Sequence, residues 1–434
     1  MEIQKIYDFY LQYRVICTDT RKIIKNSIFW ALMGENFDGN DFVAKALESG
    51  ASIAVSDSEK NKNITGCIYV ENSLKTLQTL ANFHRKKMNI PVIGITGTNG
   101  KTTTKELIST VLQQRYNTCF TKGNLNNHIG VPLSLLEITE ETHIAVIEMG
   151  ASNPGEIAEL CEICIPDYGI ITNVGSAHLL GFGNFETVLE TKSALYRAVE
   201  KNNGTIFYNA ENKILSGITG ECKKIAYGNT DYSEVQYEII SSQSPFLNVK
   251  LSHRKKEFFI NSKLVGNYNI ENICAAFTIG TYFEISPVKI AEAISEYQPQ
   301  NSRSQFVETE KNKIIIDAYN ANPSSMYVSL QNFFSLPYTD KVLILGDMLE
   351  LGEYSKQEHK KIFDFILENK FESVFLSGSE FENISKENTS KKPVSAFKTT
   401  ELLEKHLQDN PISGKHILIK GSRGIKLEKV LHLL

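Results

Sequence analysis

No apolar run in the sequence reaches the roughly 18 residues that a membrane helix needs, and the first residues lack the basic start and apolar core of a signal peptide. The seven cysteines are odd in number and are not spaced as a disulfide framework, which fits reduced thiols in a cytoplasmic protein. The formal net charge is -4, whereas broad nucleic-acid binding needs a basic face. We therefore expect a cytoplasmic protein that neither spans a membrane nor binds nucleic acid. We also expect a monomer, although nothing in the composition bears on the oligomeric state.

One cysteine pair, Cys161 and Cys164, has the CxxC spacing that occurs in metal and redox sites. The pair lies in the helical-looking stretch 154–166, and no second pair follows it. A place in the core or on a helix face is therefore the favoured interpretation, ahead of a metal or redox site.

A chain of 434 residues is too long for one ordinary core, so we expect two or three domains. Short strands and amphipathic helices fill residues 1–87. Strands then alternate with helices over 88–301, which is typical of a parallel sheet covered on both faces, and the part at 237–266 alternates like antiparallel strands at its edge. Residues 302–434 hold further apolar strands separated by helices, as in a Rossmann-type unit. The predicted fold is α/β, with three domains bounded as 1–87, 88–301 and 302–434.

A glycine-rich turn follows the apolar strand 92–96 and opens a helix, the context that a phosphate-binding loop requires. Backbone N–H groups at such a helix N-terminus can hold an anion, and glycines let the backbone approach it closely. Lys101 would reach the terminal phosphates, and the Thr102 hydroxyl would ligate Mg²⁺. Only two residues separate Gly97 from Gly100, so this is a short G-T-x-G-K-T variant of the general loop. The residues expected to hold the nucleotide here are Gly97, Thr98, Asn99, Gly100, Lys101, Thr102 and Thr103.

Two polar side chains follow strands of the same segment. Glu148 ends the strand 144–148, and His178 comes just after the strand 168–174. The carboxyl ends of parallel strands converge on one crevice, so beside the phosphate loop we expect both to bind Mg²⁺ together with ATP oxygens. A strand-capping Glu and a surface His are the alternatives. Lys192, on the next helix, would by itself be a solvated lysine, because an ammonium group repels a metal ion.

The central segment resembles the Mur ligase family, whose members join amino acids or peptides to a UDP-linked acceptor at the expense of ATP. The motifs that carry the resemblance are GTNGKTTTKE, NLNNHIGVPLSLL (124–136), IEMGAS, NVGSAHL and ETKSALY. In addition, GNYNIENICAA (266–276) is similar to the adenine-side helix of the family. Tyr268 stands where the family often has His, and 209–212 replaces a more acidic pattern. These two departures concern details of nucleotide contact.

The resemblance covers essentially the whole chain. TDTRK (18–22) and IFWALMGENFDGNDF (28–42) are similar to the UDP-substrate domain of the family. IDAYNANPSSM (316–326), LGDMLELGEYS (345–355) and IKGSRG (419–424) resemble its D-alanyl-D-alanine-adding branch and are more specific than the phosphate loop.

The resemblance implies a ligase of peptidoglycan synthesis that adds D-alanyl-D-alanine to UDP-N-acetylmuramoyl-tripeptide through an acyl phosphate. The three domains would bind the UDP-linked substrate, ATP and the incoming dipeptide, in chain order. Two Mg²⁺ ions are implied, and Lys192 would be carbamylated, which turns the cation into an anionic oxygen donor. The implied metal ligands are Thr102, Glu148, His178 and carbamylated Lys192.

Further residues take roles from the same resemblance. The implied catalytic residues are Lys101, His178, Lys192 and Arg303. The nucleotide would also meet Asn272, Arg303 and Asp317. The residues expected at the acceptor or the dipeptide are Thr20, Arg21, Asn127, His128, Asn320 and Asn322. The last two offer neutral amides for a dipeptide backbone and carboxylate, although they are also suited to a turn before Pro323.

Three other functions stay open. A sister ligase that adds a single amino acid would carry a D-N-P-R motif, which is absent, and a different counterpart to 317–320. Folylpolyglutamate synthetase shares the short loop but has no reason to carry the N-terminal segment or NANPSSM. A non-catalytic nucleotide-binding scaffold would not need the full set of charged residues around the loop.

Overall fold

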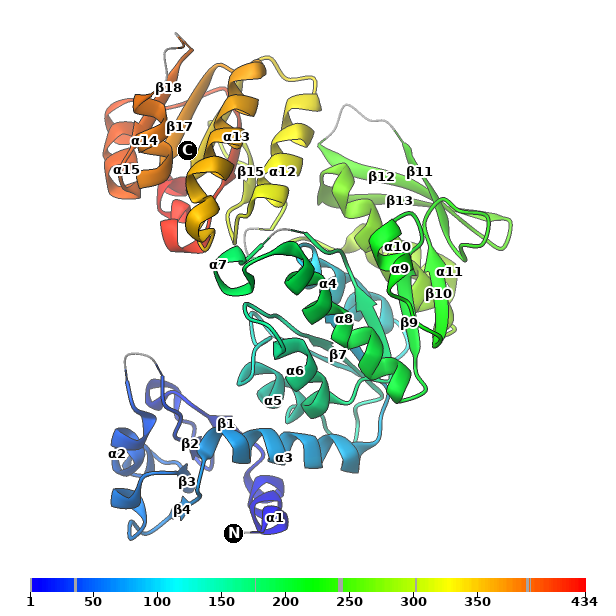
Figure 1. The fold of residues 1–434 in the computed structure, drawn as a ribbon, viewed down its shortest axis with the longest axis vertical. Coiled ribbons are helices and arrows are strands. Elements are labelled where there is room, and N and C mark those ends of the chain that lie inside the picture. Colours follow the sequence, from blue (N-terminus) through cyan, green and yellow to red (C-terminus); the bar gives the residue numbers. More distant parts are fainter. Residues whose placement is uncertain are drawn as a thin grey trace.

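The computed structural model describes residues 2–34, 37–175, 177–240, 245–300, 303–387, 390 and 392–434. Residues 35–36 and Ser176, which belong to motifs quoted above, lie outside this description, as do 241–244 of the predicted antiparallel stretch. Within the described residues, three α/β bodies follow one another along the long axis of the molecule (Figure 1). The predicted α/β class is confirmed.

The N-terminal body is built on a parallel sheet whose strands lie in chain order, β1-β2-β3-β4. Helix α3 begins where the Asn72 side chain accepts the backbone N–H of Lys75, and it ends at Asn89, which takes the left-handed conformation. This helix also packs on α5 and α6 of the central body, so it joins the two bodies. The elements are α1 (Ile3–Tyr13), β1 (Ile16–Cys17), η1 (Thr20–Lys22), β2 (Ile28–Trp30), η2 (Gly39–Phe42), α2 (Val43–Glu48), β3 (Ile53–Ser56), η3 (Glu59–Asn61), β4 (Cys67–Tyr69) and α3 (Ser73–Met88).

The central body contains a fully parallel sheet in the order β10-β9-β8-β5-β7-β6. Alternate residues of β7 enter two cores: Ala145 and Ile147 pack on the side of α5, α6 and α8, and Ile144 and Val146 on the side of α4, α10 and α11. Burial on both faces explains why the strands read as continuous apolar runs. The elements are β5 (Val92–Thr96), α4 (Lys101–Leu112), β6 (Thr118–Phe120), α5 (Gly130–Leu135), β7 (Ile144–Glu148), α6 (Glu156–Cys164), β8 (Tyr168–Ile171), α7 (Leu179–Phe182), α8 (Phe185–Lys201), β9 (Thr205–Asn209), α9 (Lys213–Gly217), β10 (Lys223–Tyr227), η4 (Asn267–Asn269), α10 (Ile270–Tyr282) and α11 (Pro287–Glu296).

The predicted antiparallel strands are present, but their expected place at the edge of the parallel sheet is wrong. β11 (Gln236–Ile240), β12 (Phe246–His253) and β13 (Lys256–Val265) form an antiparallel sheet of their own. Alternate residues of β12, such as Val249 and Leu251, are buried in the same core as α10 and α11. The apolar face of the small sheet therefore covers these helices, which it could not do in the plane of the parallel sheet.

The third body has the strand order β14-β15-β19-β16-β17-β18, and β14 is the antiparallel strand. The predicted apolar strands correspond to β15, β16, β17 and β19. The elements are β14 (Gln305–Glu308), β15 (Lys313–Asp317), α12 (Pro323–Ser335), β16 (Lys341–Gly346), η5 (Gly352–Tyr354), α13 (Ser355–Glu368), β17 (Ser373–Ser377), α14 (Ser379–Lys386), β18 (Val394–Phe397), α15 (Thr400–Asp409), β19 (His416–Lys420), η6 (Arg423–Ile425) and η7 (Leu427–Leu433).

Two expectations from composition can be compared with the fold. Among the described residues, no helix is both long and apolar enough to cross a membrane. Cys161 and Cys164 lie on α6 and are buried in the core, where the thiol of Cys161 contacts Met149, so the packing interpretation of the CxxC pair is confirmed.

Candidate active site

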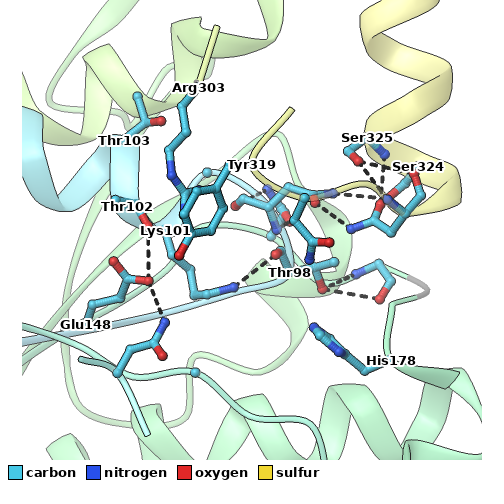
Figure 2. A pocket seen from close by; sticks show the side chains of 18 of the residues that line it. Thr98, Lys101, Thr102, Thr103, Glu148, His178, Arg303, Tyr319, Ser324 and Ser325 are labelled. Carbon is cyan, nitrogen blue, oxygen red and sulfur yellow. Dashed lines mark hydrogen bonds between the residues drawn. The ribbon is translucent and has the colours of Figure 1, made fainter. Parts of the chain in front are cut away.

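A cavity of about 990 Å³ lies between the central and third bodies, beyond the carboxyl ends of β5, β7 and β8. The phosphate loop lines one side, and Arg303, Tyr319 and the start of α12 line the other (Figure 2). The volume suits a ligand of nucleotide size. Most of the predicted nucleotide residues face it, namely Thr98, Asn99, Gly100, Lys101, Thr102, Thr103, Asn272, Arg303 and Asp317.

The phosphate loop has the backbone that its glycines predicted. Gly97 has a φ of 147° and Gly100 a φ of 79°, both in the region that favours glycine. A Cβ at Gly97 would lie 1.9 Å from the Thr172 hydroxyl, so no larger residue fits there. Asn173 holds the loop from outside, accepting the N–H groups of Thr98 and Asn99 at 2.9 Å each. The N-terminus of α4 is thus presented to the cavity by a braced loop.

Lys101 folds back over this loop. Its Nζ donates to the carbonyl oxygens of Gly97, at 2.8 Å, and Thr98, at 3.0 Å. Burial lowers the pKa of Lys101, and the nearby Glu148 opposes that shift. An anion in the loop would offer the ammonium a better partner than two carbonyl groups.

Glu148 is buried at the end of β7 and has unused capacity to accept. One carboxylate oxygen accepts from the Thr102 hydroxyl at 3.1 Å and from the Asn126 amide at 2.8 Å, while the other is buried without a hydrogen-bond partner (Figure 2). A buried acceptor without a donor is costly. An oxygen ligand free to accept, beside a threonine hydroxyl, fits a Mg²⁺ site.

The other two predicted metal ligands, Lys192 and His178, are hydrogen-bonded to other groups. The Lys192 Nζ donates to the Gly97 carbonyl oxygen at 3.1 Å, and burial, together with the charge of Lys101, lowers the pKa of Lys192 to about 7. His178 lines the cavity, but its Nδ1 is hydrogen-bonded to Glu350 of the third body. Among the described residues, no group of three or more His, Cys, Asp or Glu side chains gathers as a metal site. The structure therefore brings Thr102 and Glu148 together, but not the full set.

Asn272, which the resemblance places near the adenine, is part of a buried amide network. Its Oδ1 accepts from the Thr104 hydroxyl and its Nδ2 donates to Asn269, both at 2.9 Å. Next to it, burial and the charge of Glu211 raise the pKa of Glu271 to about 7. Asn272 thus ties the start of α10 to α4, which fixes one end of the cavity.

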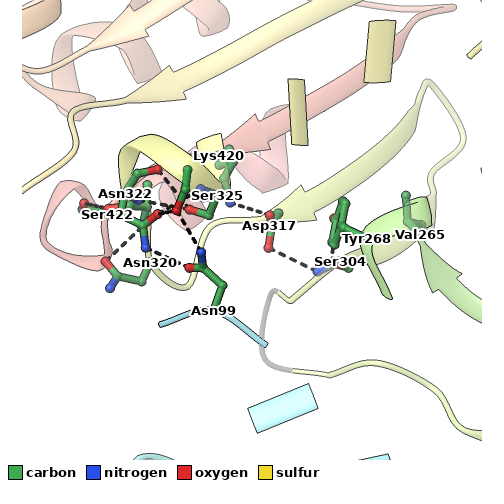
Figure 3. Close-up of polar contacts among 12 residues, drawn as sticks. Asn99, Val265, Tyr268, Ser304, Asp317, Asn320, Asn322, Ser325, Lys420 and Ser422 are labelled. Carbon is green, nitrogen blue, oxygen red and sulfur yellow. Dashed lines mark hydrogen bonds and ion pairs between the residues drawn. The ribbon is translucent and has the colours of Figure 1, made fainter. Parts of the chain in front are cut away.

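The third body contributes a charged group and an aromatic platform. The guanidinium of Arg303 lies 3.6 Å from the ring centroid of Tyr319, and its Nε is buried without a hydrogen-bond partner. Asp317 forms an ion pair with Lys420 and accepts the N–H of Ser304 at 3.4 Å (Figure 3). Arg303 is thus held over an aromatic ring with hydrogen-bonding capacity to spare.

Asn320 and Asn322 differ in what they do. Asn320 lines the cavity, and its Oδ1 accepts the N–H of Ala321 at 2.9 Å. Asn322 is the N-cap of α12, accepting from Ser325 N–H at 2.9 Å, and its Nδ2 donates to the Asn99 side chain at 2.8 Å (Figure 3). The turn interpretation of Asn322 is therefore correct as far as its oxygen is concerned, while its nitrogen joins the third body to the phosphate loop.

The predicted acceptor residues fall in two places. Asn127 and His128 line the cavity, and the Asn127 side chain accepts the N–H of Gly130, which begins α5. Thr20 and Arg21 lie in η1 of the N-terminal body, where Arg21 pairs with Asp19 at 2.9 Å. These two are not among the cavity residues that the structure describes.

The sequence interpretation missed several residues that build the site. Asn126 holds the carboxylate and Asn173 holds the loop; both lie in quoted motifs, 124–136 and NVGSAHL, but no role was assigned to either of them. Tyr319 sits inside the quoted motif 316–326, so the motif could have drawn attention to it. Glu350 also lies in a quoted motif, but only the meeting of two domains shows what it contacts.

Models of three consecutive domains match the chain: "Mur ligase family, catalytic domain" over 12–94, "Mur ligase middle domain" over 95–280 and "Mur ligase, glutamate ligase domain" over 302–423. The UDP-N-acetylmuramoyl-tripeptide--D-alanyl-D-alanine ligase of Bacillus subtilis is 35% identical over 423 residues, which cover 96% of this chain and 92% of that protein. The chain belongs to the Mur ligase family. The expected three-domain organisation is confirmed.

Solved structures of this family have the same fold over the whole length. MurF from Acinetobacter baumannii superimposes with a TM-score of 0.87 and is 28% identical, with 99% of this chain and 97% of that chain covered. The MurF ligase of Thermotoga maritima, solved in complex with ADP, gives a TM-score of 0.85 at 28% identity, covering 98% and 97%. The family resemblance inferred from the motifs is thereby confirmed.

Proposed function

We propose that this Mur ligase joins D-alanyl-D-alanine to UDP-N-acetylmuramoyl-tripeptide and converts ATP to ADP and phosphate. One juxtaposition supports the proposal: the phosphate loop of the central domain and the segment 316–326 of the third domain face the same cavity. Nucleotide and incoming amine would meet there, and the Bacillus subtilis relative, 35% identical over 96% of this chain, carries the name of this reaction.

The chemistry proceeds in two steps. The acceptor carboxylate attacks the γ-phosphorus of ATP, and the bond from that phosphorus to the bridging oxygen breaks. ADP departs, and the acceptor becomes an acyl phosphate. The amine of D-alanyl-D-alanine then attacks the acyl carbon, phosphate departs, and the amine gives up its proton to water. Lys101 and Arg303 would offset the charge of the transferring group, since protein groups mainly position and neutralise in phosphoryl transfer.

The Thr102 hydroxyl and the unpaired Glu148 oxygen are donors that fit Mg²⁺. Thr102 would hold one ion, and Glu148, His178 and a carbamylated Lys192 a second. When bound, such ions neutralise phosphate charge and orient oxygens. A buried lysine whose pKa is lowered to about 7 has a substantial share of neutral amine at neutral pH, and the neutral amine is the form that reacts with CO₂.

Each of the three domains would bind one of the three substrates. Residues 1–87, with Thr20 and Arg21, would hold the UDP-linked acceptor, whose peptide would pass Asn127 and His128. Residues 88–301 would hold ATP, and residues 302–434 the dipeptide, with Asn320 and Asn322. The enzyme would act in the cytoplasm, where its small polar substrates are expected, and it would act as a monomer.

The test measures phosphate release with each substrate omitted in turn. We expect release only when ATP, UDP-N-acetylmuramoyl-tripeptide and D-alanyl-D-alanine are all present. ATP hydrolysis that ignores the other two would indicate a nucleotide-binding scaffold. Release with lysine or diaminopimelate and the dipeptide nucleotide would indicate the sister ligase, and replacing D-alanyl-D-alanine by other dipeptides would define the amine.

A further inference from the structure

His178 and Glu350 face each other across the boundary between the central and third domains. Besides the bond between His178 Nδ1 and the Glu350 carboxylate, the N–H of Leu180 donates to the Glu350 carbonyl oxygen at 3.3 Å. Helix α7 and the turn η5 are in contact here, and Figure 1 shows α7 beside the third domain. Leu180 also reaches Gly352, where an added Cβ would come within 3.2 Å of its side chain. The pair is thus the polar part of a wider contact between domains.

Both residues have an unfavourable backbone conformation. His178 has a φ of 54° and Glu350 a φ of 64°, in the left-handed region that side chains other than glycine rarely adopt. Strain of this kind persists where the surroundings impose it, and it concentrates at functional sites. A glycine at position 350 would remove the strain, but it would also remove the carboxylate.

The loop that carries Glu350 is anchored at the three residues that precede it. Asp347 accepts the N–H groups of Glu380 and Phe381, at 2.9 and 3.0 Å, at the start of α14. The next two backbone N–H groups are also bound: Met348 donates to His359, and Leu349 to the Ser422 hydroxyl, at 2.9 Å each. Three consecutive residues are therefore fixed just before the chain turns Glu350 toward the central domain.

The chemistry of the pair determines the state of the imidazole. An ionised carboxylate only accepts, so the proton of the hydrogen bond must sit on Nδ1 of His178. In the neutral ring this leaves Nε2 with a free lone pair, the form in which histidine binds metals. Histidine ligands are generally held by a carboxylate or carbonyl group on their other nitrogen.

We propose that Glu350 is the positioning residue of His178: from the third domain it sets the tautomer and ring orientation in which Nε2 of His178 binds the divalent cation. This rests on the proposed function, in which His178 is a metal ligand. Because the two residues belong to different domains, the ligand is set only while the domains touch. Glu350 thereby links metal binding to the approach of the domain that holds the amine.

The experiment measures binding of Mn²⁺, as a probe for Mg²⁺, to the full chain in the presence of ADP, by the electron paramagnetic resonance of the free ion. We expect Glu350→Ala to weaken the Mn²⁺ site about 10-fold, the lower end of the effect of removing such a partner. Glu350→Gln keeps a hydrogen-bond acceptor without the charge, so its affinity for Mn²⁺ should lie between those of the original protein and Glu350→Ala. Glu353→Ala removes a similar exposed carboxylate three residues away and should bind as the original protein does.

The pair is tested as a unit by a double-mutant cycle. His178→Ala should weaken Mn²⁺ binding at the same site. The double variant His178→Ala/Glu350→Ala should bind Mn²⁺ only slightly more weakly than His178→Ala, because Glu350 then has no imidazole to orient. Unchanged affinity in Glu350→Ala, or fully additive losses, would overturn the proposal. Unchanged affinity in His178→Ala would overturn it too, and would remove His178 from the proposed metal site.

Phosphate release with all substrates separates this outcome from the function itself. Glu350→Ala should still require both UDP-N-acetylmuramoyl-tripeptide and D-alanyl-D-alanine, with a raised requirement for Mg²⁺. More than half of the Glu350 side chain is exposed, so its removal should leave the fold intact, and thermal unfolding of the variant checks this. Loss of the substrate dependence in the original protein would instead count against the proposed function.

Discussion

The surroundings of Lys192 change the protonation of its amine. On a solvated helix it would be an ordinary cation, but here it is buried, bonded to the Gly97 carbonyl and close to Lys101. Desolvation disfavours its charged form and favours the neutral amine. The lowered pKa of Lys192 therefore supports the carbamylation that we propose for this residue.

We expect Lys192→Ala to lose ligase activity, because no anionic oxygen donor can then form at that position. A small carboxylic acid such as acetate should restore part of the activity by occupying the space of the carbamate. Phosphate release with and without the acid measures this, with Lys201→Ala, at the exposed end of the same helix, as the control. Full activity of Lys192→Ala without added acid would contradict the carbamate.

Glu271 is a second single residue with a testable consequence: it should make the stability of the fold depend on pH. Burial and Glu211 raise the pKa of Glu271 from 4.5 to about 7, so the folded protein keeps a proton that the unfolded chain has released. Stability from this group is present below pH 4.5 and is lost as the pH rises toward 7. Glu271→Gln should therefore gain relative stability, at most about 3 kcal/mol, between pH 5 and pH 8. Thermal unfolding of both proteins at the two pH values tests this; parallel curves would contradict it.

At the scale of elements, burial decided what the sequence could predict. Strands β5, β7, β15 and β16 are covered on both faces, so each is a continuous apolar run and was found. Strands β14 and β18 are short and half-buried at the two edges of their sheet, and the sequence pattern did not predict them. The antiparallel strands were recognised from alternation, but their partner surface on α10 and α11 is a tertiary property that no local pattern contains.

The candidate site divides in the same way. The loop 97–102 was predicted because strand, glycines, lysine and helix are consecutive. Contacts between Asn99 and Asn322, or His178 and Glu350, join residues more than 170 positions apart, and depend on how two domains meet. The spacing of residues in the sequence therefore cannot predict these contacts.

Asn322 carries a prediction about helix α12. Its oxygen caps the helix, and its nitrogen reaches Asn99, so two substitutions can separate the roles. Asn322→Ala should destabilise the protein by about 1 kcal/mol through loss of the cap. Asn322→Asp should keep the cap but lose the donor to Asn99. Both should raise the KM for D-alanyl-D-alanine, while urea unfolding should separate them; equal stabilities would contradict the capping argument.

At the scale of the whole molecule, the central domain holds the phosphate loop while Arg303 belongs to the third. The guanidinium of Arg303 rests on Tyr319, and its Nε is buried without a hydrogen-bond partner, so it has a donor to spare for the nucleotide that we propose to bind the central domain. A donor that stabilises charge in a transferring phosphoryl group acts mainly in the transition state.

Arg303→Ala should therefore slow ADP formation by at least about 100-fold in a single turnover, the scale of losing one preorganised donor. Nucleotide affinity should change little, because the loop and Lys101 hold the phosphates from the central domain. Rapid-quench measurement of ADP and binding of a fluorescent ATP analogue test the two halves, with Arg197→Ala, whose arginine pairs with Glu190 on the exposed face of α8, as the control. A loss confined to nucleotide affinity would mean that Arg303 binds ATP in the ground state, and that approach of the third domain is not part of the phosphoryl transfer.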